Sequence, residues 1–357
     1  MRKYPCLEID LTKLHHNASA IRKLCSAKGI EVVGVTKGFS AIPEIAQIMI
    51  DSGINLLGDS RLENIQSLKE VGFKAEMMLI RIPMLHEVDL VVKLTNCSLN
   101  SELLVMEALS IAAIKQGKVH DIILMVDLGD LREGVLPGEI HDTIKKITPL
   151  KGIHLKGLGV NLNCVSGIQP TVENLSELVT LSRKAEKEMG IELEILSGGN
   201  TSSLALVTQN DIPKEINQLR VGEGILLGHT DIFTNLENTF QDSIILFAEI
   251  IELKQKESIP RGLVLRDAFG QIPKIEDTGV RKRAILAIGK QDVYPEHLSP
   301  LDQNLNIIAA SSDHLIVDVT DSSQDYQVGD IIQFQLSYPG ILSTTTSKYV
   351  STFFKQE

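Results

Sequence analysis

Lys37 follows a short apolar run at residues 31–35 and is the first side chain in the sequence whose place suggests chemistry. The run predicts a buried strand, so the lysine amine is expected at the carboxyl end of that strand. A buried ammonium loses hydration free energy, and it therefore meets a counter-charge or gives up its proton and becomes a nucleophilic amine. A lysine at a strand end can also extend to water, so this residue by itself does not decide between the two.

Two glycine-rich segments further along the chain have the composition of an anion site. Residues 196–203 read Leu-Ser-Gly-Gly-Asn-Thr-Ser-Ser, and residues 220–225 read Arg-Val-Gly-Glu-Gly-Ile. Glycine lets backbone N–H groups approach an anion closely, hydroxyl groups add donors, and a helix start supplies N–H groups with a favourable dipole. Each segment alone could be an ordinary turn, but the two together with Lys37 favour a phosphate site.

These segments fall at regular places in an alternating pattern of strands and helices. The expected strands cover residues 31–35, 54–58, 76–80, 96–99, 121–126, 153–159, 193–196 and 218–220. Helical patterns lie between them, for example at residues 42–50, 101–114, 138–147 and 171–189. Eight such units predict an α/β fold, a closed (β/α)8 TIM barrel, with a doubly wound open sheet as the alternative.

In a barrel of this kind the residues at the carboxyl ends of the strands face the active site. The usual phosphate site of this fold is formed by the loops after strands seven and eight, which here are the two glycine-rich segments. The candidate side chains at the strand ends are Lys37, Arg81, Asp127, Asn161, Ser197 and Arg220.

After about residue 242 the pattern changes to strands without long helices. These runs cover residues 243–252, 284–288, 306–310, 315–320 and 331–336, with turns expected at residues 259–262, 328–330 and 338–340. We therefore expect a barrel domain at residues 1–235 and a mainly-β domain at residues 236–357. A short strand at residues 6–10, followed by a helical pattern at residues 12–24, could pair with either domain.

Composition excludes several classes of function. The chain has 357 residues, 43% of them hydrophobic, and a formal net charge of −11, which disfavours a nucleic-acid or anionic-membrane partner. The four cysteines lack the spacing of a metal site, so we expect reduced thiols and no metal. No apolar stretch has the length of a signal peptide or a membrane span, and the expected location is the cytoplasm.

The motifs as a set resemble the alanine racemase superfamily, the fold-type III enzymes that use pyridoxal 5′-phosphate (PLP), and most of all its ornithine racemase branch. The resemblance covers nearly the whole chain, and the barrel motifs are more specific than those of the β domain. The matching segments are Leu7-Glu-Ile-Asp-Leu11 with Asn17, Val35-Thr-Lys-Gly38, Val126-Asp-Leu-Gly-Asp-Leu-Arg-Glu-Gly134, Gly198-Gly-Asn-Thr-Ser202, Arg220-Val-Gly222, Ala287-Ile-Gly-Lys-Gln-Asp292 and Ser312-Asp313.

This resemblance implies roles for individual barrel residues. Lys37 would hold PLP through its amine and would act as base and acid on one face of the substrate Cα. Arg220 would donate to the pyridine nitrogen and, because a guanidinium keeps its proton, would leave that nitrogen largely unprotonated. Arg220 could instead only pair with Glu223 at the barrel end. Around the phosphate the cofactor-binding residues would be Gly199, Asn200, Thr201, Gly222 and Glu223. Ser197 would also bind the cofactor, and Asn161 would stand in place of a histidine that commonly lies near the ring.

The chain also departs from the alanine racemase pattern. Met125 stands where many alanine racemases have a modified lysine beside the family's arginine, which here is Arg132. The second base of alanine racemase is a tyrosine of the partner subunit, and the aligned residue here is Lys290. An exposed Lys290, with Asp292 or Tyr294 acting in its place, is the alternative. The resemblance makes Arg132 a substrate-binding residue, and charge complementarity makes Asp313 the candidate for a distal substrate ammonium.

The function that follows from the resemblance is racemisation of an amino acid by two-base proton transfer, with ornithine as the expected substrate and alanine, lysine, serine or a broad range as alternatives. Bases from two chains imply a homodimer whose active sites are shared between subunits. A non-catalytic PLP-binding homeostasis protein would keep the lysine and the glycines but would lack a second domain. A decarboxylase of this fold would be expected to carry a cysteine in the β domain, and none occurs after Cys164. A scaffold without activity is the remaining alternative.

Overall fold

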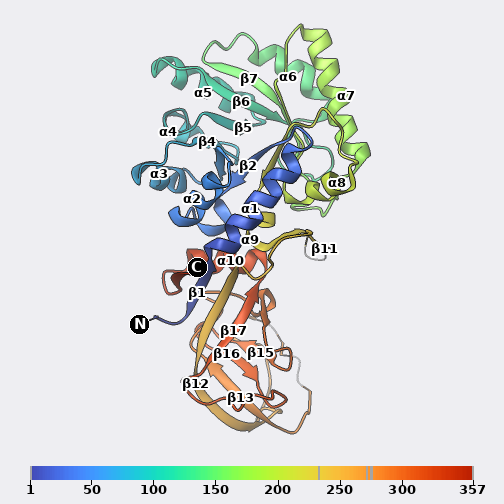
Figure 1. Cartoon of the computed structure of the whole chain (residues 1–357). Coiled ribbons are helices and arrows are strands. Elements are labelled where there is room, and N and C mark those ends of the chain that lie inside the picture. Colours follow the sequence, from blue (N-terminus) through green and yellow to red (C-terminus); the bar gives the residue numbers. More distant parts are fainter. Residues whose placement is uncertain (1, 232–233, 271, 274–275, 356–357) are drawn as a thin grey trace. The chain divides into compact units, whose positions relative to one another are not determined.

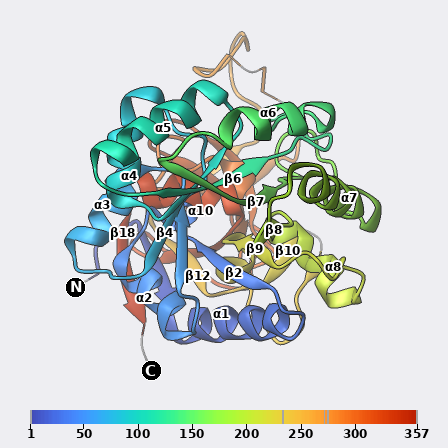
Figure 2. The same cartoon turned by 90° about the horizontal axis from the view of Figure 1, so that it is seen from above.

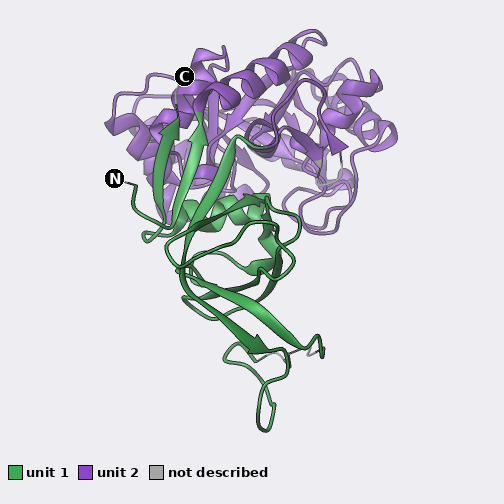
Figure 3. Cartoon of the chain, turned by 60° about the horizontal axis from the view of Figure 1, so that its bottom comes forward, with its two compact units in different colours: residues 1–10, 242–357 green, residues 11–241 purple. Residues whose placement is uncertain are grey.

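The computed structural model describes residues 2–231, 234–270, 272, 273 and 276–355. The chain divides into two compact units, one formed by residues 11–241 and the other by residues 1–10 and 242–357 (Figure 3). Within the described ranges, no helix is both long and apolar enough to cross a membrane.

The first unit is a closed barrel of eight parallel strands, with helices around the outside (Figures 1 and 2). The TIM barrel predicted from the sequence is therefore confirmed. The strands are β2 (Glu31–Val35), β3 (Leu56–Asp59), β4 (Glu76–Leu79), β5 (Cys97–Asn100), β6 (His120–Met125), β7 (Ile153–Gly159), β8 (Ile195–Ser197) and β9 (Gln218–Val221). The helices are α1 (Leu11–Ser26), α2 (Pro43–Asp51), α3 (Leu62–Glu70), α4 (Val88–Leu94), α5 (Leu103–Lys115), α6 (Ile140–Ile147), α7 (Val172–Met189), α8 (Leu204–Gln209) and α9 (Glu223–Leu227). A short pair, β10 (His229–Asp231) and β11 (Thr234–Asn235), follows α9.

Burial on both faces explains why the barrel strands are almost continuously apolar. Alternate residues of neighbouring strands meet in the interior, where Val33, Leu56, Met78, Ile123 and Met125 belong to one buried cluster. The Met125 side chain is thus part of the barrel core.

The helices around the barrel bury apolar residues on the face that packs against the strands. Helix α1 buries a stripe at helical spacing that includes Leu14, Ala18 and Ile21. Its polar member, Asn17, is buried because its side chain amide pairs with the backbone of Phe240, accepting from N–H at 2.7 Å and donating to the carbonyl oxygen at 2.8 Å. Asn17, which belongs to the first family-like segment, therefore ties α1 to the end of the barrel unit.

The second unit is an eight-stranded sheet. Its main path runs β14 (Leu298–Pro300), β17 (Ile331–Leu336), β12 (Ile244–Glu257), β13 (Val280–Leu286), β16 (Leu315–Asp318) and β15 (Asn306–Ala310). Strand β1 (Cys6–Asp10) pairs antiparallel with β12 and parallel with β18 (Ser351–Lys355), so the first strand of the chain belongs to this sheet. A helix, α10 (Tyr338–Thr346), precedes β18.

One predicted turn in this unit is wrong. Residues 338–340 begin helix α10 rather than a turn. Pro339 is compatible with this because a proline in the first turn of a helix leaves no intrahelical hydrogen bond unmade. The turn expected at residues 328–330 is present, with Gly329 at a positive φ of 97°.

Candidate active site

Lys37 is separated from the end of β2 by one residue and lies in a single turn of 3-10 helix at Lys37–Phe39. The residue before it, Thr36, is buried and its hydroxyl donates to Asp59 at the end of β3 (2.6 Å). The two residues after the turn, Ser40 and Ala41, both have positive φ angles, 51° and 53°. Left-handed backbone is costly for residues other than glycine, so the surrounding contacts hold this turn in place.

The surroundings of Lys37 favour its neutral form. Burial is the main cause that lowers the pKa of its ammonium below the ordinary 10.5, and the positive charge of Arg132 lowers it further. Three groups act in the opposite direction: Cys164, Asp59 and Glu133. A neutral, nucleophilic amine is therefore available at a lower pH than for an exposed lysine.

Arg220, on β9, is buried, and its guanidinium reaches residues at the ends of β7 and β8. Its Nη1 donates to the hydroxyl of Ser197, and its Nη2 donates to the carbonyl oxygen of Val160 (2.7 Å) and more weakly to Oδ1 of Asn161 (3.4 Å). Burial lowers its pKa to about 10, which still leaves the guanidinium charged near neutrality. All of these acceptors are uncharged, so Arg220 retains a positive charge that its hydrogen bonds do not neutralise.

The two glycine-rich segments meet at the same end of the barrel. Gly199 has a φ of 112°, and a Cβ at this position would lie 2.8 Å from the Ser203 hydroxyl. The hydroxyl of Thr201 accepts from the N–H of Gly224 (3.2 Å), which joins the first segment to helix α9. A Cβ on Gly222, which precedes α9, would lie 3.0 Å from the backbone oxygen of Val35. In the first turn of α9 the N–H groups of Ile225 and Leu226 donate to the carbonyl oxygen of Gly222, and that of Gly224 to Thr201, so the N–H of Glu223 is the donor that this turn could offer to an anion.

Asn200 and Glu223 complete these segments. The Asn200 amide donates to Oδ1 of Asn161 (3.2 Å), and its own oxygen accepts from the N–H of Ser202 (2.9 Å). Glu223 interacts through Oε1 with Nε2 of His229 (3.0 Å). Arg220 is bonded to neutral groups and not to Glu223, so the alternative of a simple Arg220–Glu223 pair is not what the structure contains.

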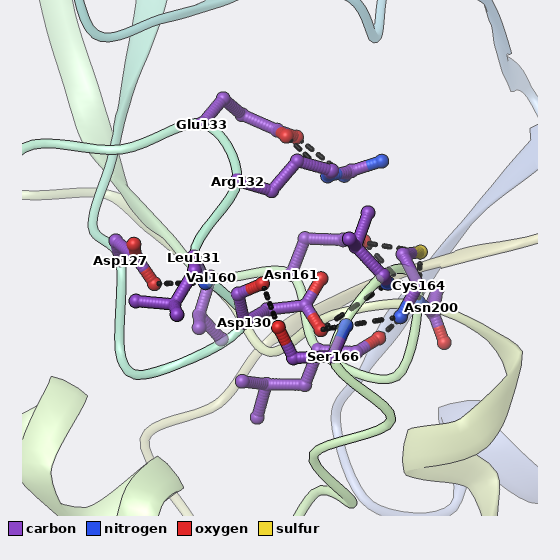
Figure 4. Close-up of polar contacts among 12 residues, drawn as sticks. Asp127, Asp130, Leu131, Arg132, Glu133, Val160, Asn161, Cys164, Ser166 and Asn200 are labelled. Carbon is purple, nitrogen blue, oxygen red and sulfur yellow. Dashed lines mark hydrogen bonds and ion pairs between the residues drawn. The ribbon is translucent and has the colours of Figure 1, made fainter.

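The loop after β6 carries Arg132 and is fixed by a buried carboxylate (Figure 4). Arg132 forms an ion pair with the neighbouring Glu133. Asp130, which is 1% exposed, accepts at Oδ1 from three consecutive backbone N–H groups, those of Cys164 (3.4 Å), Val165 (3.4 Å) and Ser166 (3.1 Å). This contact fastens the loop after β6 to the loop after β7.

Cys164 is an exposed thiol in the second of these loops. Its sulfur accepts from the amides of Asn161 (2.9 Å) and Asn200 (3.5 Å), as Figure 4 shows. These two contacts place Cys164 beside two of the residues predicted to bind the cofactor, Asn161 and Asn200.

Lys290 and Asp313 lie in the β unit, on neighbouring segments. The backbone N–H of Lys290 donates to the carbonyl oxygen of Ser311 (2.8 Å), and a Cβ on Gly289 would lie 2.4 Å from the backbone nitrogen of Asp313. Lys290 is not exposed, since its side chain keeps 12% of its accessible surface, whereas Asp313 keeps 58%. The hydroxyl of Ser312 is the main cause that lowers the pKa of Asp313.

The two residues considered as alternatives to Lys290 have different surroundings. Asp292 is buried and accepts from the hydroxyl of Ser347 (2.6 Å) and from the N–H of Gly289 (3.4 Å), so its carboxylate serves the local fold. Tyr294 is 46% exposed.

Sequence reasoning placed the strand-end residues together but did not identify the residues that fix them. Asp59 and Asp130 were missed, although each follows or lies near the end of a predicted strand. Their role depends on contacts between loops that are distant in the sequence, and no local pattern indicates these. Sequence reasoning assigned no site role to Cys164. Its position three residues after Asn161, a predicted cofactor-binding residue, is the signal that could have indicated one.

Comparison with known proteins agrees with this geometry. The family described as alanine racemase, N-terminal domain, matches residues 9–229. The chain belongs to the alanine racemase family.

Two relatives cover almost all of this family member. An ornithine racemase of Acetoanaerobium sticklandii is 44% identical over 349 residues, 97% of this chain and 98% of that protein. A lysine racemase of Thermotoga maritima is 38% identical over 354 residues, 99% of each chain. Among solved structures, alanine racemase from a D-cycloserine-producing Streptomyces lavendulae matches with a TM-score of 0.76 at 16% identity, covering 100% of this chain and 98% of that one. The structural match shows that the racemase fold extends through both units.

Proposed function

We propose that this chain is a PLP-dependent amino-acid racemase that interconverts L- and D-ornithine. The observation that carries the proposal is the barrel-end cluster, in which an amine with a lowered pKa, Lys37, accompanies the buried Arg220 and two joined glycine-rich segments. The full-length similarity to an ornithine racemase supports the substrate.

The residues present fit PLP. Arg220 is a buried cation whose hydrogen bonds go to uncharged oxygens, which suits an acceptor such as a pyridine nitrogen. Gly199 and Gly222 stand where a Cβ would crowd its neighbours, and the helix start that follows Gly222 suits a phosphate. The residues that would hold PLP are Lys37, Asn161, Ser197, Gly199, Asn200, Thr201, Arg220, Gly222 and Glu223. When bound, PLP supplies an electron sink that makes the substrate Cα proton removable.

The chain's own residues would divide the proton transfer between them. Lys37, as a neutral amine, takes the Cα proton on one face, and Lys290, as an ammonium, returns a proton on the opposite face. The reverse reaction exchanges these roles. Arg220 keeps a permanent donor beside the ring and does not itself transfer a proton.

Two further residues would bind the substrate. Arg132 would hold the carboxylate, sharing or replacing its present ion pair with Glu133. Asp313 would pair with the distal ammonium of ornithine, and an Asp313→Asn variant is then expected to lose far more affinity for ornithine than for alanine.

The active unit would be a homodimer. If Lys290 comes from the partner subunit, each β unit completes the active site of the other chain, and an isolated subunit is inactive.

The test is the loss of optical rotation of L-ornithine, with L-lysine, L-alanine and L-serine in parallel, using protein supplied with PLP. We expect the fastest loss with ornithine and none with the Lys37→Ala variant. Bound PLP without turnover of any of the four amino acids would contradict the proposal and favour a non-catalytic PLP-binding protein.

A further inference from the structure

Lys290 is held in an unusual way for a lysine of the β unit. Its side chain is only 12% exposed, whereas Lys254 and Lys256 on β12 keep 63% and 42%. A lysine ammonium at the surface of a sheet normally extends into water. Other residues must therefore shield the Lys290 side chain from water, and two of those near its ammonium belong to the loop between β12 and β13.

The covering groups are a carboxylate and an aromatic ring. Oδ2 of Asp267 lies 3.9 Å from Nζ of Lys290, and Nζ lies 3.9 Å from the centre of the Phe269 ring. A carboxylate and the face of an aromatic ring both attract an ammonium. The distance to Asp267 is longer than that of a hydrogen-bonded ion pair. The two contacts therefore attract the ammonium to this position without forming hydrogen bonds to its N–H groups.

The sequence Arg266-Asp-Ala-Phe-Gly270 builds the turn that presents both groups. The N–H of Gly270 donates to the carbonyl oxygen of Asp267 (3.0 Å), and the guanidinium of Arg266 donates to the carbonyl oxygen of Gly270 (2.6 Å). Oδ1 of Asp267 accepts from the N–H of Phe269 (2.9 Å). The oxygen of Asp267 that lies 3.9 Å from Nζ of Lys290 is the second one, Oδ2, of the same carboxylate.

The opposite end of the Lys290 side chain is fixed as well. Its N–H is bonded to Ser311, and Gly289 lets its segment lie directly against the backbone of Ser312 and Asp313. The flexible four-carbon stem of a lysine is therefore restrained both at the backbone and at the ammonium. An acid or base must be held within hydrogen-bond reach of the proton it transfers, and this restraint serves that requirement.

We propose that Asp267 and Phe269 are positioning residues that hold the Lys290 ammonium for proton transfer. The inference rests on the proposed function, in which Lys290 acts on one face of the substrate Cα. A surface ion pair of purely structural value would contribute little, and it would not need an aromatic ring over the ammonium.

The first experiment compares Asp267→Asn and Phe269→Leu with Leu265→Ala, a change at a 69% exposed residue of the same loop. With ornithine in both directions, kcat is expected to fall at least about tenfold in the first two variants, with KM within about twofold of wild type, because Lys290, the acid in one direction and the base in the other, is misplaced and not removed. The Leu265→Ala variant should match wild type. A wild-type kcat in both Asp267→Asn and Phe269→Leu would overturn the inference.

The second experiment uses chemical rescue, which a merely structural role would not affect. Methylamine added to Lys290→Ala should restore part of the racemisation, because the Asp267 and Phe269 groups would bind a small ammonium at the vacated place. The double variants Lys290→Ala/Asp267→Asn and Lys290→Ala/Phe269→Leu should be rescued less. Equal rescue in all three would show that these residues do not hold the ammonium.

The outcomes separate this inference from the proposed function. If Lys290→Ala is inactive while Asp267→Asn and Phe269→Leu keep wild-type kcat, the racemase proposal stands and the positioning role is wrong. If Lys290→Ala racemises ornithine at the wild-type rate, Lys290 is not the second base, and the positioning role of Asp267 and Phe269 is wrong as well. If the wild-type protein racemises no amino acid, both proposals fail.

Discussion

At the residue scale, the place of Lys37 depends on a neighbour that takes no part in chemistry. Thr36 and Asp59 are each 1% exposed. The Asp59 carboxylate accepts hydrogen bonds from the Thr36 hydroxyl, the N–H of Arg61 (2.8 Å) and the amide of Asn64 (3.1 Å). Burial raises the pKa of Asp59, while these hydrogen bonds oppose the change. The residue before the lysine is thus anchored to the next strand of the barrel.

Replacing Thr36 by valine keeps the shape of the side chain and removes this hydrogen bond. We expect a loss of about 1–3 kcal/mol in the free energy of unfolding, because a buried carboxylate loses a donor. Urea unfolding followed by circular dichroism measures it. Thr180→Val, at an exposed hydroxyl of α7 that donates to Ser176, is the matched control and should change stability much less. Equal losses in both variants would contradict the anchoring role.

The sequence alone was sufficient to place Lys37 and Arg220 at the ends of strands, because the period of the strands locates these ends. Asp130 could not be predicted, since its value comes from three N–H groups 34 to 36 residues away in another loop. The contact of Lys290 with Asp267 and Phe269 could not be predicted from the sequence either, because no local pattern indicates which segment a long loop folds against.

At the element scale, the segments that carry Lys290 and Asp313 depend on a glycine. A Cβ on Gly289 would lie 2.5 Å from the backbone oxygen of Ser312 as well as 2.4 Å from the nitrogen of Asp313. These neighbours are backbone atoms and cannot rotate away. Any side chain at this position must push the two segments apart.

A Gly289→Ala variant should therefore racemise ornithine at least about tenfold more slowly while it still binds PLP, because the change lies outside the barrel. Steady-state kinetics and the visible absorbance of bound PLP measure the two effects. Gly138→Ala is the control, since a Cβ there would meet nothing within 4 Å. An unchanged rate for Gly289→Ala would mean that these segments do not contribute to catalysis.

Strands and helices were predicted best where burial gives their sequence a regular apolar pattern. Strands such as β2 and β7 were predicted with the bounds that the structure gives, because barrel strands are apolar on both faces. Strand β14 was not predicted because it has only three residues and ends in a proline. Strand β18 was not predicted because its residues are half-buried or exposed without alternation along the strand. Helix α10 was predicted as a turn because Pro339 and Gly340 are turn residues as well as acceptable residues of a first helical turn.

At the scale of the whole molecule, the barrel has a second polar end. A cavity of about 390 Å³ lies at the amino ends of the strands, opposite to Lys37, and His120 is one of its lining residues. His120 is 2% exposed, and its Nε2 contacts the hydroxyl of Ser98 on β5 (2.9 Å). Burial lowers its pKa from 6.5 to about 4.

His120 should therefore make the stability of the barrel depend on pH. The unfolded chain takes up this proton near pH 6.5, whereas the folded chain resists it down to about pH 4, so the stabilisation is complete above pH 6.5 and is lost as the pH falls toward 4. The loss should reach about 3 kcal/mol between pH 7 and pH 4. Urea unfolding at both pH values should show a smaller loss for His120→Gln. Equal losses would contradict this assignment.

The proposed homodimer makes a prediction for mixed assemblies. Refolding equal amounts of Lys37→Ala and Lys290→Ala together should restore about a quarter of wild-type activity, because half of the dimers would contain one intact shared site. Each variant alone should remain inactive. Absence of any recovery, in a mixture shown to contain hybrid dimers, would mean that both lysines of a site come from one chain.

The central claim is that two lysines transfer protons on opposite faces of one substrate carbon. The most direct measurement follows the Cα proton of L-ornithine by NMR in D2O, together with the optical purity of the recovered amino acid. We predict that wild-type protein gives deuterated ornithine of both hands, that Lys37→Ala gives neither exchange nor inversion, and that Lys290→Ala loses inversion. Inversion at the wild-type rate by either variant would contradict the claim.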